Sequence, residues 1–333
     1  MNIVLTRLDR IGDLILSTPA IASVRRSWPD AHVTLACTPH NAVVVERNPD
    51  IDDVAIAEPG DAARLLGPRF RGRTDLAIAL APRSADFALV GATRAPQRIG
   101  YTYVRRYAAR LTARRYLTRL AVSEADPDLA DRDESYVVRH EVDQVLALVG
   151  IAGGAAVVRD LVVPIADEDR ASVAGVPAGG IAFQLAPRWL RDGSTLDSTL
   201  ELIRSLRAFG LPVVAAYGSE SIDLAARVRA AGAADAVVGD LAFGAWAAVY
   251  EKSALVVTVD TGATHVASAT RRPTVVLFEH RYFNLNSQEW SPYGVPAACL
   301  RKPARGDSGS LARMREEIVA AVGTLLTRTC VHD

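Results

Sequence analysis

The stretch Asn2-Ile-Val-Leu-Thr-Arg-Leu-Asp-Arg-Ile-Gly-Asp-Leu-Ile-Leu-Ser-Thr-Pro-Ala-Ile21 opens the chain and decides its fold class. Residues 2–6 form a short apolar run of strand length, and after a polar turn apolar residues recur at helical spacing from Leu14 to Val24. A strand, a loop and a helix in this order begin a βαβ unit. The stretch therefore predicts an α/β domain with a parallel sheet.

The same alternation continues through most of the chain. Further strands are predicted at residues 32–36, 54–57, 76–80, 181–185, 212–216, 255–259 and 274–278. Helices are predicted at residues 196–209, 222–231, 242–250, 262–270 and 311–326. Glycines and prolines interrupt residues 151–180, which places a linker there. We expect one α/β domain at residues 1–165, a similar second one at 175–310, and a final helix within 311–333 that crosses back to the first domain.

Composition restricts the class of function. The 333 residues carry 38 basic and 38 acidic side chains, so no overall charge recruits nucleic acid, and only Lys252 and Lys302 are lysines. Cys37, Cys299 and Cys330 are an odd set without metal-ligand spacing, and no signal peptide or apolar run of bilayer length is recognised. We expect a cytoplasmic protein without a metal site, whose membrane contact is at most peripheral.

A first candidate site is Asp260-Thr-Gly-Ala-Thr-His265, where a predicted strand ends and a helix begins. Helix N-termini offer unpaired N–H groups and a positive dipole end, which suit a diphosphate. Gly262 permits close approach, Thr261 offers a hydroxyl, and His265 lies one turn further on. The alternative, that Asp260 or Thr261 only caps the helix, is equally compatible with this pattern.

A second candidate site is the loop Thr6-Arg-Leu-Asp-Arg-Ile-Gly-Asp13. It follows the first strand, and ligands of doubly wound domains bind at the carboxyl ends of strands. By itself, Asp13 is more typical of a helix cap than of a catalytic group. The loop contains one glycine only, so it lacks the dinucleotide-binding fingerprint of oxidoreductases.

Read with their flanks, these loops resemble glycosyltransferase family 9, the ADP-heptose:lipopolysaccharide heptosyltransferases. Arg10-Ile-Gly-Asp-Leu-Ile-Leu-Ser-Thr-Pro-Ala-Ile21 is similar to the family's opening motif. Three further segments resemble its later motifs in the right order: Asn48-Pro-Asp-Ile-Asp52, His140-Glu-Val-Asp143, and Val259-Asp-Thr-Gly-Ala-Thr-His-Val-Ala267 with Arg272-Pro-Thr-Val-Val-Leu-Phe278.

The resemblance implies a GT-B fold, with two Rossmann-like doubly wound domains facing across a cleft, and an inverting reaction that needs no metal or other cofactor. Asp13 would be the catalytic base. Asp260, Thr261, Gly262 and His265 would bind a nucleotide-sugar donor of the ADP-heptose type. Arg10 and Gly12 would lie on the acceptor side.

The chain departs from the family pattern at two places. A Lys-x-Trp-Pro stretch, whose lysine meets the donor phosphates in the family, is replaced by Pro187-Arg-Trp-Leu-Arg-Asp-Gly-Ser194. Arg188 and Arg191 are the candidate substitutes, although a guanidinium and an ammonium group are not equivalent, and Asp192 falls near the lysine's place. The usual Phe-Gly after the last strand is replaced by Phe278-Glu-His280.

Residues 94–119 form another local feature, with eight arginines, four tyrosines and no acidic residue. We interpret this segment as a surface for an anionic acceptor or for lipid headgroups, with Arg105, Arg106 and Arg110 as contacts. The alternative is a solvated, arginine-rich pair of helices.

The sequence thus predicts transfer of a heptose or related sugar to a lipopolysaccharide-core or related glycan, on the cytoplasmic face of the inner membrane. Two alternatives stay open. One keeps the fold with a different donor or with a protein or small-molecule acceptor, and the other is a catalytically silent GT-B-like binding protein.

Overall fold

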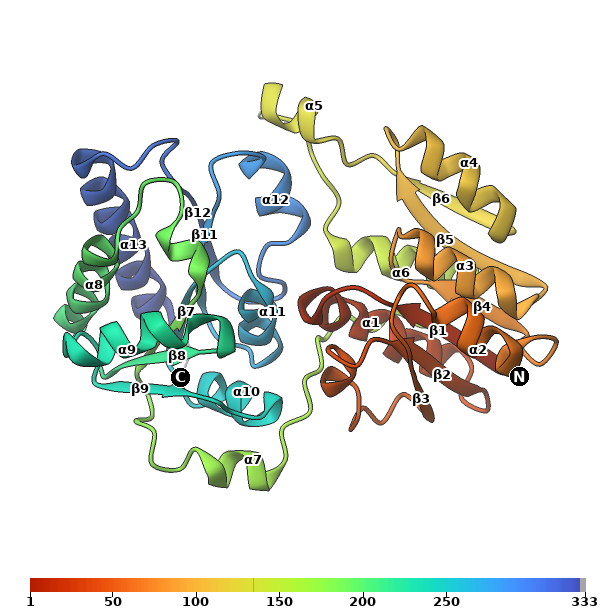
Figure 1. The fold of residues 1–333 in the computed structure, drawn as a ribbon, viewed down its shortest axis with the longest axis horizontal. Helices are drawn as coiled ribbons and strands as arrows, with labels where there is room; N and C mark the ends of the chain where they lie inside the picture. Colours follow the sequence, from red (N-terminus) through yellow and green to blue (C-terminus); the bar gives the residue numbers. More distant parts are fainter. Residues whose placement is uncertain (134, 330–333) are drawn as a thin grey trace. The chain divides into compact units, whose positions relative to one another are not determined.

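The computed structural model describes residues 1–133 and 135–329 (Figure 1). The chain divides into two compact units. The first unit comprises Met1–Pro164 together with Gln288–Trp290, and the second comprises Ile165–Ser287 and the residues from Ser291 onward. Cys330, one of the three cysteines considered above, lies outside the described residues.

The first unit is built on a parallel sheet with the strand order β3-β2-β1-β4-β5-β6. Its strands are β1 (Asn2–Arg7), β2 (His32–Cys37), β3 (Asp53–Ile56), β4 (Leu76–Ala79), β5 (Gln97–Tyr103) and β6 (Arg119–Ser123). Its helices are α1 (Ile11–Ser27), the 3₁₀ turn η1 (Ala42–Val44), α2 (Ala62–Phe70), α3 (Ser84–Thr93), α4 (Tyr107–Tyr116), α5 (Pro127–Arg132) and α6 (Glu141–Ile151).

The second unit repeats this topology, with the strand order β12-β11-β10-β7-β8-β9. Its strands are β7 (Ile181–Leu185), β8 (Val213–Tyr217), β9 (Ala236–Gly239), β10 (Leu255–Val259), β11 (Thr274–Phe278) and β12 (Ala297–Arg301). Its helices are α7 (Asp167–Ser172), η2 (Pro187–Leu190), α8 (Leu196–Ser205), η3 (Leu206–Phe209), η4 (Ser219–Ser221), α9 (Ile222–Ala230), α10 (Phe243–Glu251), α11 (Gly262–Ala269), α12 (Phe283–Glu289) and α13 (Ser308–Thr329). In each unit the order is the doubly wound one, so the two Rossmann-like folds are confirmed.

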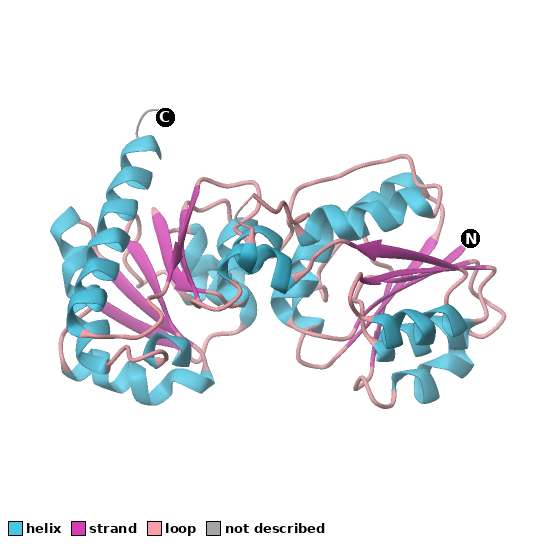
Figure 2. Ribbon diagram, turned by 90° about the horizontal axis from the view of Figure 1, so that it is seen from above, coloured by secondary structure: helices cyan, strands magenta, loops and turns pink. Residues whose placement is uncertain are grey.

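The central strands are apolar along their length because helices cover both faces of each sheet (Figure 2). In the first unit, Leu5 of β1 lies in register with Leu35 of β2 on one side and with Ile78 of β4 on the other. Side chains on both faces of β1 are therefore buried, and its end is fixed where the loop to α1 begins.

Helix α1 has no polar face over most of its length, because every residue from Leu14 to Val24 is buried. Pro19 lies inside the helix and cannot donate to the carbonyl of Ile15. The Thr18 hydroxyl donates to that carbonyl instead, at 2.7 Å, which compensates for the missing bond. The packed helix holds its first turn, including Asp13, in a fixed position.

Residues 94–119 differ from the alternative considered above, a solvated, arginine-rich pair of helices. The segment contains a strand, β5, followed by a single helix, α4. In β5 the residues from Ile99 to Thr102 are buried, so Tyr101 is a core residue and not a surface aromatic. The helix-pair alternative is therefore wrong, and strand β5 was not predicted because its arginine and tyrosine residues conceal the apolar content that identifies a strand.

The expected return of the last helix to the first domain is wrong. Helix α13 packs in the second unit, where Met314, Ile318, Val322 and Leu325 join the buried core. These residues recur every three or four positions, so they form one apolar stripe that the second sheet covers. The segment that groups with the first unit is Gln288–Trp290, at and just beyond the end of α12.

No helix among the described residues has the length and apolar character required to cross a bilayer.

Two glycines test the packing directly. A Cβ atom on Gly180 would lie 2.3 Å from the carbonyl oxygen of Pro212, to which the Ile181 amide donates, whereas a Cβ on Gly150 would meet nothing within 4 Å. Gly180→Ala should therefore destabilise the second unit by about 1–3 kcal/mol or more. Gly150→Ala, near the end of α6, should stabilise the first unit by about 0.5–1 kcal/mol. Thermal and urea unfolding measure both effects. Two variants as stable as the wild type would contradict the packing described.

Candidate active site

Each sheet has one point where the strand order reverses, and the candidate residues lie there. In the first unit the reversal falls between β1 and β4, and in the second between β7 and β10. Ligands of doubly wound folds bind at the carboxyl ends of strands at this point. Asp13, Arg188 and Asp260 follow β1, β7 and β10 respectively, at or near these ends.

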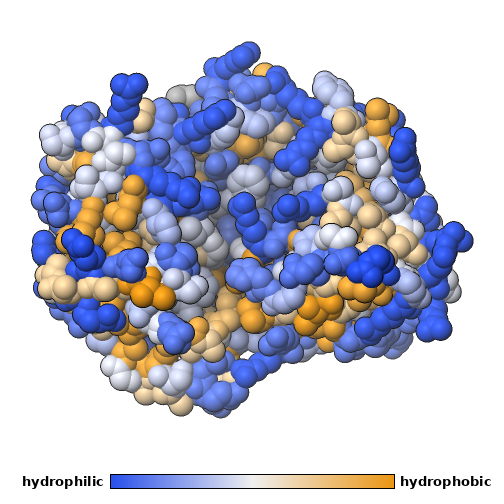
Figure 3. Space-filling model, in the orientation of Figure 1, coloured by the Kyte–Doolittle hydropathy of each residue, from blue (hydrophilic) through white to orange (hydrophobic). Residues whose placement is uncertain are grey.

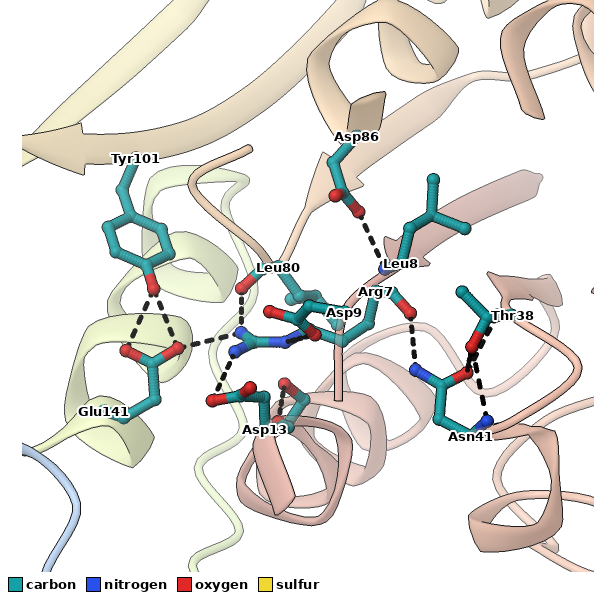
Figure 4. Close-up of polar contacts among 11 residues, drawn as sticks. Arg7, Leu8, Asp9, Asp13, Thr38, Asn41, Leu80, Asp86, Tyr101 and Glu141 are labelled. Atoms are coloured by element: carbon teal, nitrogen blue, oxygen red, sulfur yellow. Dashed lines mark hydrogen bonds and ion pairs between the residues drawn. The ribbon is translucent and has the colours of Figure 1, made fainter. Parts of the chain in front are cut away.

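The buried guanidinium of Arg7, the last residue of β1, organises the first of these sites (Figure 4). Its Nε lies 2.9 Å from Asp9 Oδ1, its Nη1 lies 2.8 Å from Glu141 Oε1, and its Nη2 lies 3.3 Å from Asp13 Oδ1. Nη1 also donates to the carbonyl of Leu80, just beyond β4. Burial alone would lower the pKa of Arg7, but the three carboxylates outweigh it and raise the pKa above its ordinary value.

Asp13 is the member of this cluster that solvent and ligands can reach. Arg10 occupies the N-cap position of α1, so Asp13 is the third helical residue and not the cap. The Asp13 side chain is 22% exposed to solvent, whereas the side chains of Arg7 and Glu141 are 2% and 1% exposed. Burial, followed by the charge of Asp9, raises the pKa of Asp13 to about 7, although Arg7 acts in the opposite direction. Asp13 can therefore both accept and hold a proton near neutral pH.

Two buried glutamates each accept a hydrogen bond from a tyrosine of β5. The Tyr101 hydroxyl lies 2.7 and 2.9 Å from the two carboxylate oxygens of Glu141. Tyr103 is hydrogen-bonded to Glu289, which belongs to the short segment grouped with the first unit. Burial, with a smaller contribution from Glu141, raises the pKa of Glu289 to about 8.

Asp86 adds a further buried carboxyl beneath the same loop. It lies in the first turn of α3, and one of its oxygens accepts a hydrogen bond from the Leu8 amide at 3.2 Å. Burial and the charge of Asp9 raise its pKa to about 7. One buried arginine thus faces more carboxyl groups than it can balance, so the cluster retains protons at neutral pH.

The remaining first-loop residues predicted for the acceptor lie at the start of α1. Arg10 is exposed and precedes the helix, and Gly12 is buried within its first turn. Nothing in their geometry tests the acceptor role, which stays a prediction.

The second site centres on an ion pair between Arg188 and Asp260, whose Nη1 and Oδ2 atoms lie 2.9 Å apart. Arg188 lies in η2, which the buried Trp189 fixes in place. The Trp189 ring stacks on Phe183 with centroids 4.7 Å apart, and its Nε1 donates to the Gln184 carbonyl at 2.7 Å. Aromatic packing in the core therefore holds Arg188 next to the end of β10.

Helix α11 begins directly after Asp260. Thr261 is its N-cap residue but makes no capping hydrogen bond through its side chain, and its hydroxyl donates to the Val259 carbonyl at 3.3 Å. Gly262 is the first helical residue and is partly exposed, while His265 is buried one turn further on. The Thr261 side chain therefore does not cap the helix, and its role in ligand binding stays a prediction.

The two departures from the family pattern contact each other. Asp192, which has a φ of 57°, is hydrogen-bonded to Glu279, and this shared contact lowers the pKa of Asp192, while burial raises that of Glu279. The buried Lys302 Nζ lies 3.4 Å from Glu279 Oε1 and also donates to the carbonyl of Arg188. His280 contacts the Lys302 carbonyl at 3.2 Å. Arg191 follows η2 and is exposed.

The three arginines predicted as contacts in residues 94–119 fall into two groups. Arg105 is paired with Asp126 and Asp128, so acidic residues just beyond the segment balance its charge. The guanidinium groups of Arg106 and Arg110 lie over the rings of Tyr103 and Tyr107. Helix α4 also exposes Leu111 with Arg114 and Arg115. Figure 3 shows apolar and hydrophilic side chains side by side over this helix, at the upper right.

Residues 200–317 match the model of glycosyltransferase family 9 (heptosyltransferase). The resemblance to family 9 is confirmed. The matched family is one of glycosyltransferases, the enzyme class that the sequence predicts. No curated protein sequence matches the chain.

Solved structures of family 9 share the fold. A family 9 glycosyltransferase from Veillonella parvula is 20% identical, with a TM-score of 0.77 over 98% of this chain and 97% of that chain. E. coli ADP-heptose lps heptosyltransferase II is 18% identical, with a TM-score of 0.74 over 99% of each chain. E. coli heptosyltransferase WaaC with ADP is 15% identical, with a TM-score of 0.68 over 96% of this chain and 99% of that one. At these identities the likeness establishes the GT-B fold.

Sequence reasoning did not find Glu141, Glu289, Lys302 or the role of Arg7. Arg7 was in the quoted loop, and the scarcity of lysine made Lys302 conspicuous. The sequence does not show which residues Arg7 and Lys302 contact. Arg7 and Glu141 are 134 positions apart, and Lys302 and Arg188 are 114 positions apart.

The raised pKa of Asp86 makes stability depend on pH. The folded protein binds this proton more tightly than the unfolded chain does, since the pKa moves from an ordinary 3.8 to about 7. The contribution of this proton to the free energy of unfolding is fully present below pH ~4 and is lost as the pH rises towards 7. Asp86→Asn keeps an oxygen for the Leu8 amide but does not titrate. The free energy of unfolding of the variant should be higher than that of the wild type by about 1–3 kcal/mol at pH 8, and the difference should be much smaller at pH 5.

Urea unfolding at the two pH values measures this difference, with the exposed Asp30→Asn as the control for loss of a charge. A constant difference between pH 5 and pH 8 would show that Asp86 is ionised at both.

Proposed function

We propose that this protein is an inverting, metal-independent glycosyltransferase that moves a heptose or related sugar from a nucleotide-sugar donor to a lipopolysaccharide-core or related glycan. Asp13 takes the proton of an acceptor hydroxyl. The acceptor oxygen attacks the anomeric carbon, and the bond from that carbon to the diphosphate breaks, so that the nucleoside diphosphate leaves with the electron pair. Attack from the face opposite the leaving group inverts the anomeric carbon.

The position and the chemistry of Asp13 carry this proposal. Its carboxylate is partly exposed at the reversal point of the first sheet, and its pKa is about 7. A general base works best when its pKa lies near the working pH, because it is then deprotonated and still basic. An ordinary surface aspartate has neither the fixed position nor the raised pKa.

The donor is assigned to the second unit. The N-terminus of α11 directs N–H groups and the positive end of its dipole at the position of a diphosphate. Arg188 and Arg191 add positive charge, although Asp260 already balances part of that of Arg188. The similar solved structures include E. coli ADP-heptose lps heptosyltransferase II and E. coli heptosyltransferase WaaC with ADP, so an ADP-sugar is the donor we propose.

The acceptor is assigned to the first unit, with Arg10, Gly12 and the α4 region as contacts. Tyr107 and Leu111 of α4 are 69% and 67% exposed and lie one helical turn apart, beside Arg110, Arg114 and Arg115. Apolar side chains among arginines suit the headgroup region of an anionic membrane. We therefore propose that α4 makes a peripheral membrane contact.

Asp13→Asn tests the base. Turnover should fall by roughly 100-fold or more, while the affinity for the donor stays the same, because a general base acts in the transition state. Steady-state kinetics and donor titration measure the two quantities, with Asp30→Asn as the control. Chelators should leave the wild type active. Near-normal turnover in Asp13→Asn, or a strict need for a metal, would refute the mechanism.

Gly262→Val tests the donor site. A side chain at the first residue of α11 should block close approach of a diphosphate and weaken ADP binding by about 10-fold or more, without unfolding the protein. Isothermal titration measures affinity, and a thermal-shift panel of ADP, UDP and GDP identifies the base. Gly309→Val, at the start of α13, is the matched control. Lower stability with unchanged affinity would mean that the loop only starts a helix.

The triple variant Arg110→Gln, Arg114→Gln, Arg115→Gln tests α4. Binding to anionic vesicles should weaken and the KM for a lipid-linked acceptor should rise, while ADP binding stays the same. Salt should mimic the variant, because screening shortens to about 3 Å at 1 M. Arg105 is omitted because Asp126 and Asp128 balance it. The control replaces Arg204, Arg227 and Arg229 in the second unit. Equal vesicle binding by both variants at low salt would exclude a membrane role for α4.

A further inference from the structure

The three nitrogens of Arg7 are divided unequally among three carboxylates. Nε and Nη1 make close contacts with Asp9 and Glu141, at 2.9 and 2.8 Å. Nη2 lies 3.3 Å from Asp13 Oδ1, which is the longest of the three nitrogen–oxygen distances (Figure 4). Asp9 and Glu141 are also less exposed than Asp13. Asp13, the most exposed of the three carboxylates, therefore makes the weakest contact with the Arg7 guanidinium.

We propose that Glu141 is a positioning residue for the reaction, which keeps Asp13 available as a base by competing with it for Arg7. This inference rests on the proposed function, because it assumes that Asp13 removes the acceptor proton. Glu141 does not contact the substrates and acts only through the guanidinium.

Several contacts hold the Glu141 carboxylate in place against Arg7. Tyr101 donates to both of its oxygens, at 2.7 and 2.9 Å, and Arg7 Nη1 donates to one of them. It is also the first residue of α6, where the helix dipole stabilises a negative charge. Burial raises the pKa of Glu141 above its ordinary value, while the contacts with Arg7 and Tyr101 act in the opposite direction and favour the ionised glutamate.

The groups that face Asp13 come from several elements. Arg7 belongs to β1, Asp9 and Arg10 to the following loop, Glu141 to α6, and Glu289 to the segment grouped with the first unit. The two arginines lower the pKa of Asp13, while burial, Asp9 and Glu141 raise it. If the charge of Glu141 were absent, Arg7 would stabilise the Asp13 anion more strongly. Asp13 would then ionise at a lower pH and become a weaker base.

The test is the pH dependence of kcat/KM in Glu141→Gln. In the wild type, kcat/KM should rise with pH, reach half of its plateau near pH 7 and level off roughly one pH unit higher, as the pKa of Asp13 requires. Glutamine keeps the shape and an acceptor for Tyr101 but removes the charge. The acid limb should move down by about one pH unit, and the plateau should fall several-fold because the base is weaker.

Three further variants make the result decisive. Asp9→Asn removes the other competitor and should move the limb in the same direction. Glu46→Gln, an exposed residue outside this cluster, should leave it in place. If Glu141→Gln does not fold, Tyr101→Phe removes the two bonds that favour ionised Glu141 and should produce a smaller shift in the same direction.

A folded Glu141→Gln protein with an unmoved acid limb would overturn the inference, since a merely structural residue changes stability and not this limb. An upward shift would overturn it as well. Failure of the proposed function is distinguishable, because Asp13→Asn would then retain turnover in the same assay.

Discussion

The first unit depends on one buried arginine. Arg7 ends β1, donates to the Leu80 carbonyl beyond β4, and pairs with Glu141 at the start of α6. It thus joins the two strands that flank the reversal of the sheet to a helix far along the chain. Removal of one partner from such a pair typically costs about 3–5 kcal/mol, because a buried charge is left behind. The same guanidinium touches Asp13, so the interaction that holds the fold together also sets the chemistry of the proposed base.

The second unit uses the same topology with a different support. Its reversal point carries Arg188 and Asp260 on the ends of β7 and β10, and buried aromatic rings fix the turn that bears the arginine. Lys302 adds a buried ammonium beneath that turn, in contact with Glu279. The two places where the sequence departs from the family pattern, Asp192 and Glu279, therefore form one connected group.

Local patterns in the sequence were sufficient for much of the fold. Buried parallel strands are short apolar runs, so β1, β4, β7, β10 and β11 were predicted within one or two residues. Strand β5 was missed because arginine and tyrosine interrupt its apolar pattern, and the placement of α13 was wrong because an amphipathic helix does not specify which sheet covers it. Asp13 and Asp260 were found from their positions after strands. Their partners were not, because the contact between Arg7 and Glu141 closes 134 positions of chain and leaves no local trace.

The central claim is that a divided guanidinium leaves the pKa of Asp13 close to neutral pH, so that Asp13 is a stronger base than an ordinary aspartate. The most direct measurement is a titration of the side-chain carboxyl carbon of Asp13 by ¹³C NMR in aspartate-labelled protein, with the resonance assigned by its loss in Asp13→Asn. The account predicts a midpoint at about 7 in the free enzyme. A midpoint near the ordinary value of about 4 would contradict it, because Arg7 would then stabilise the Asp13 anion in full.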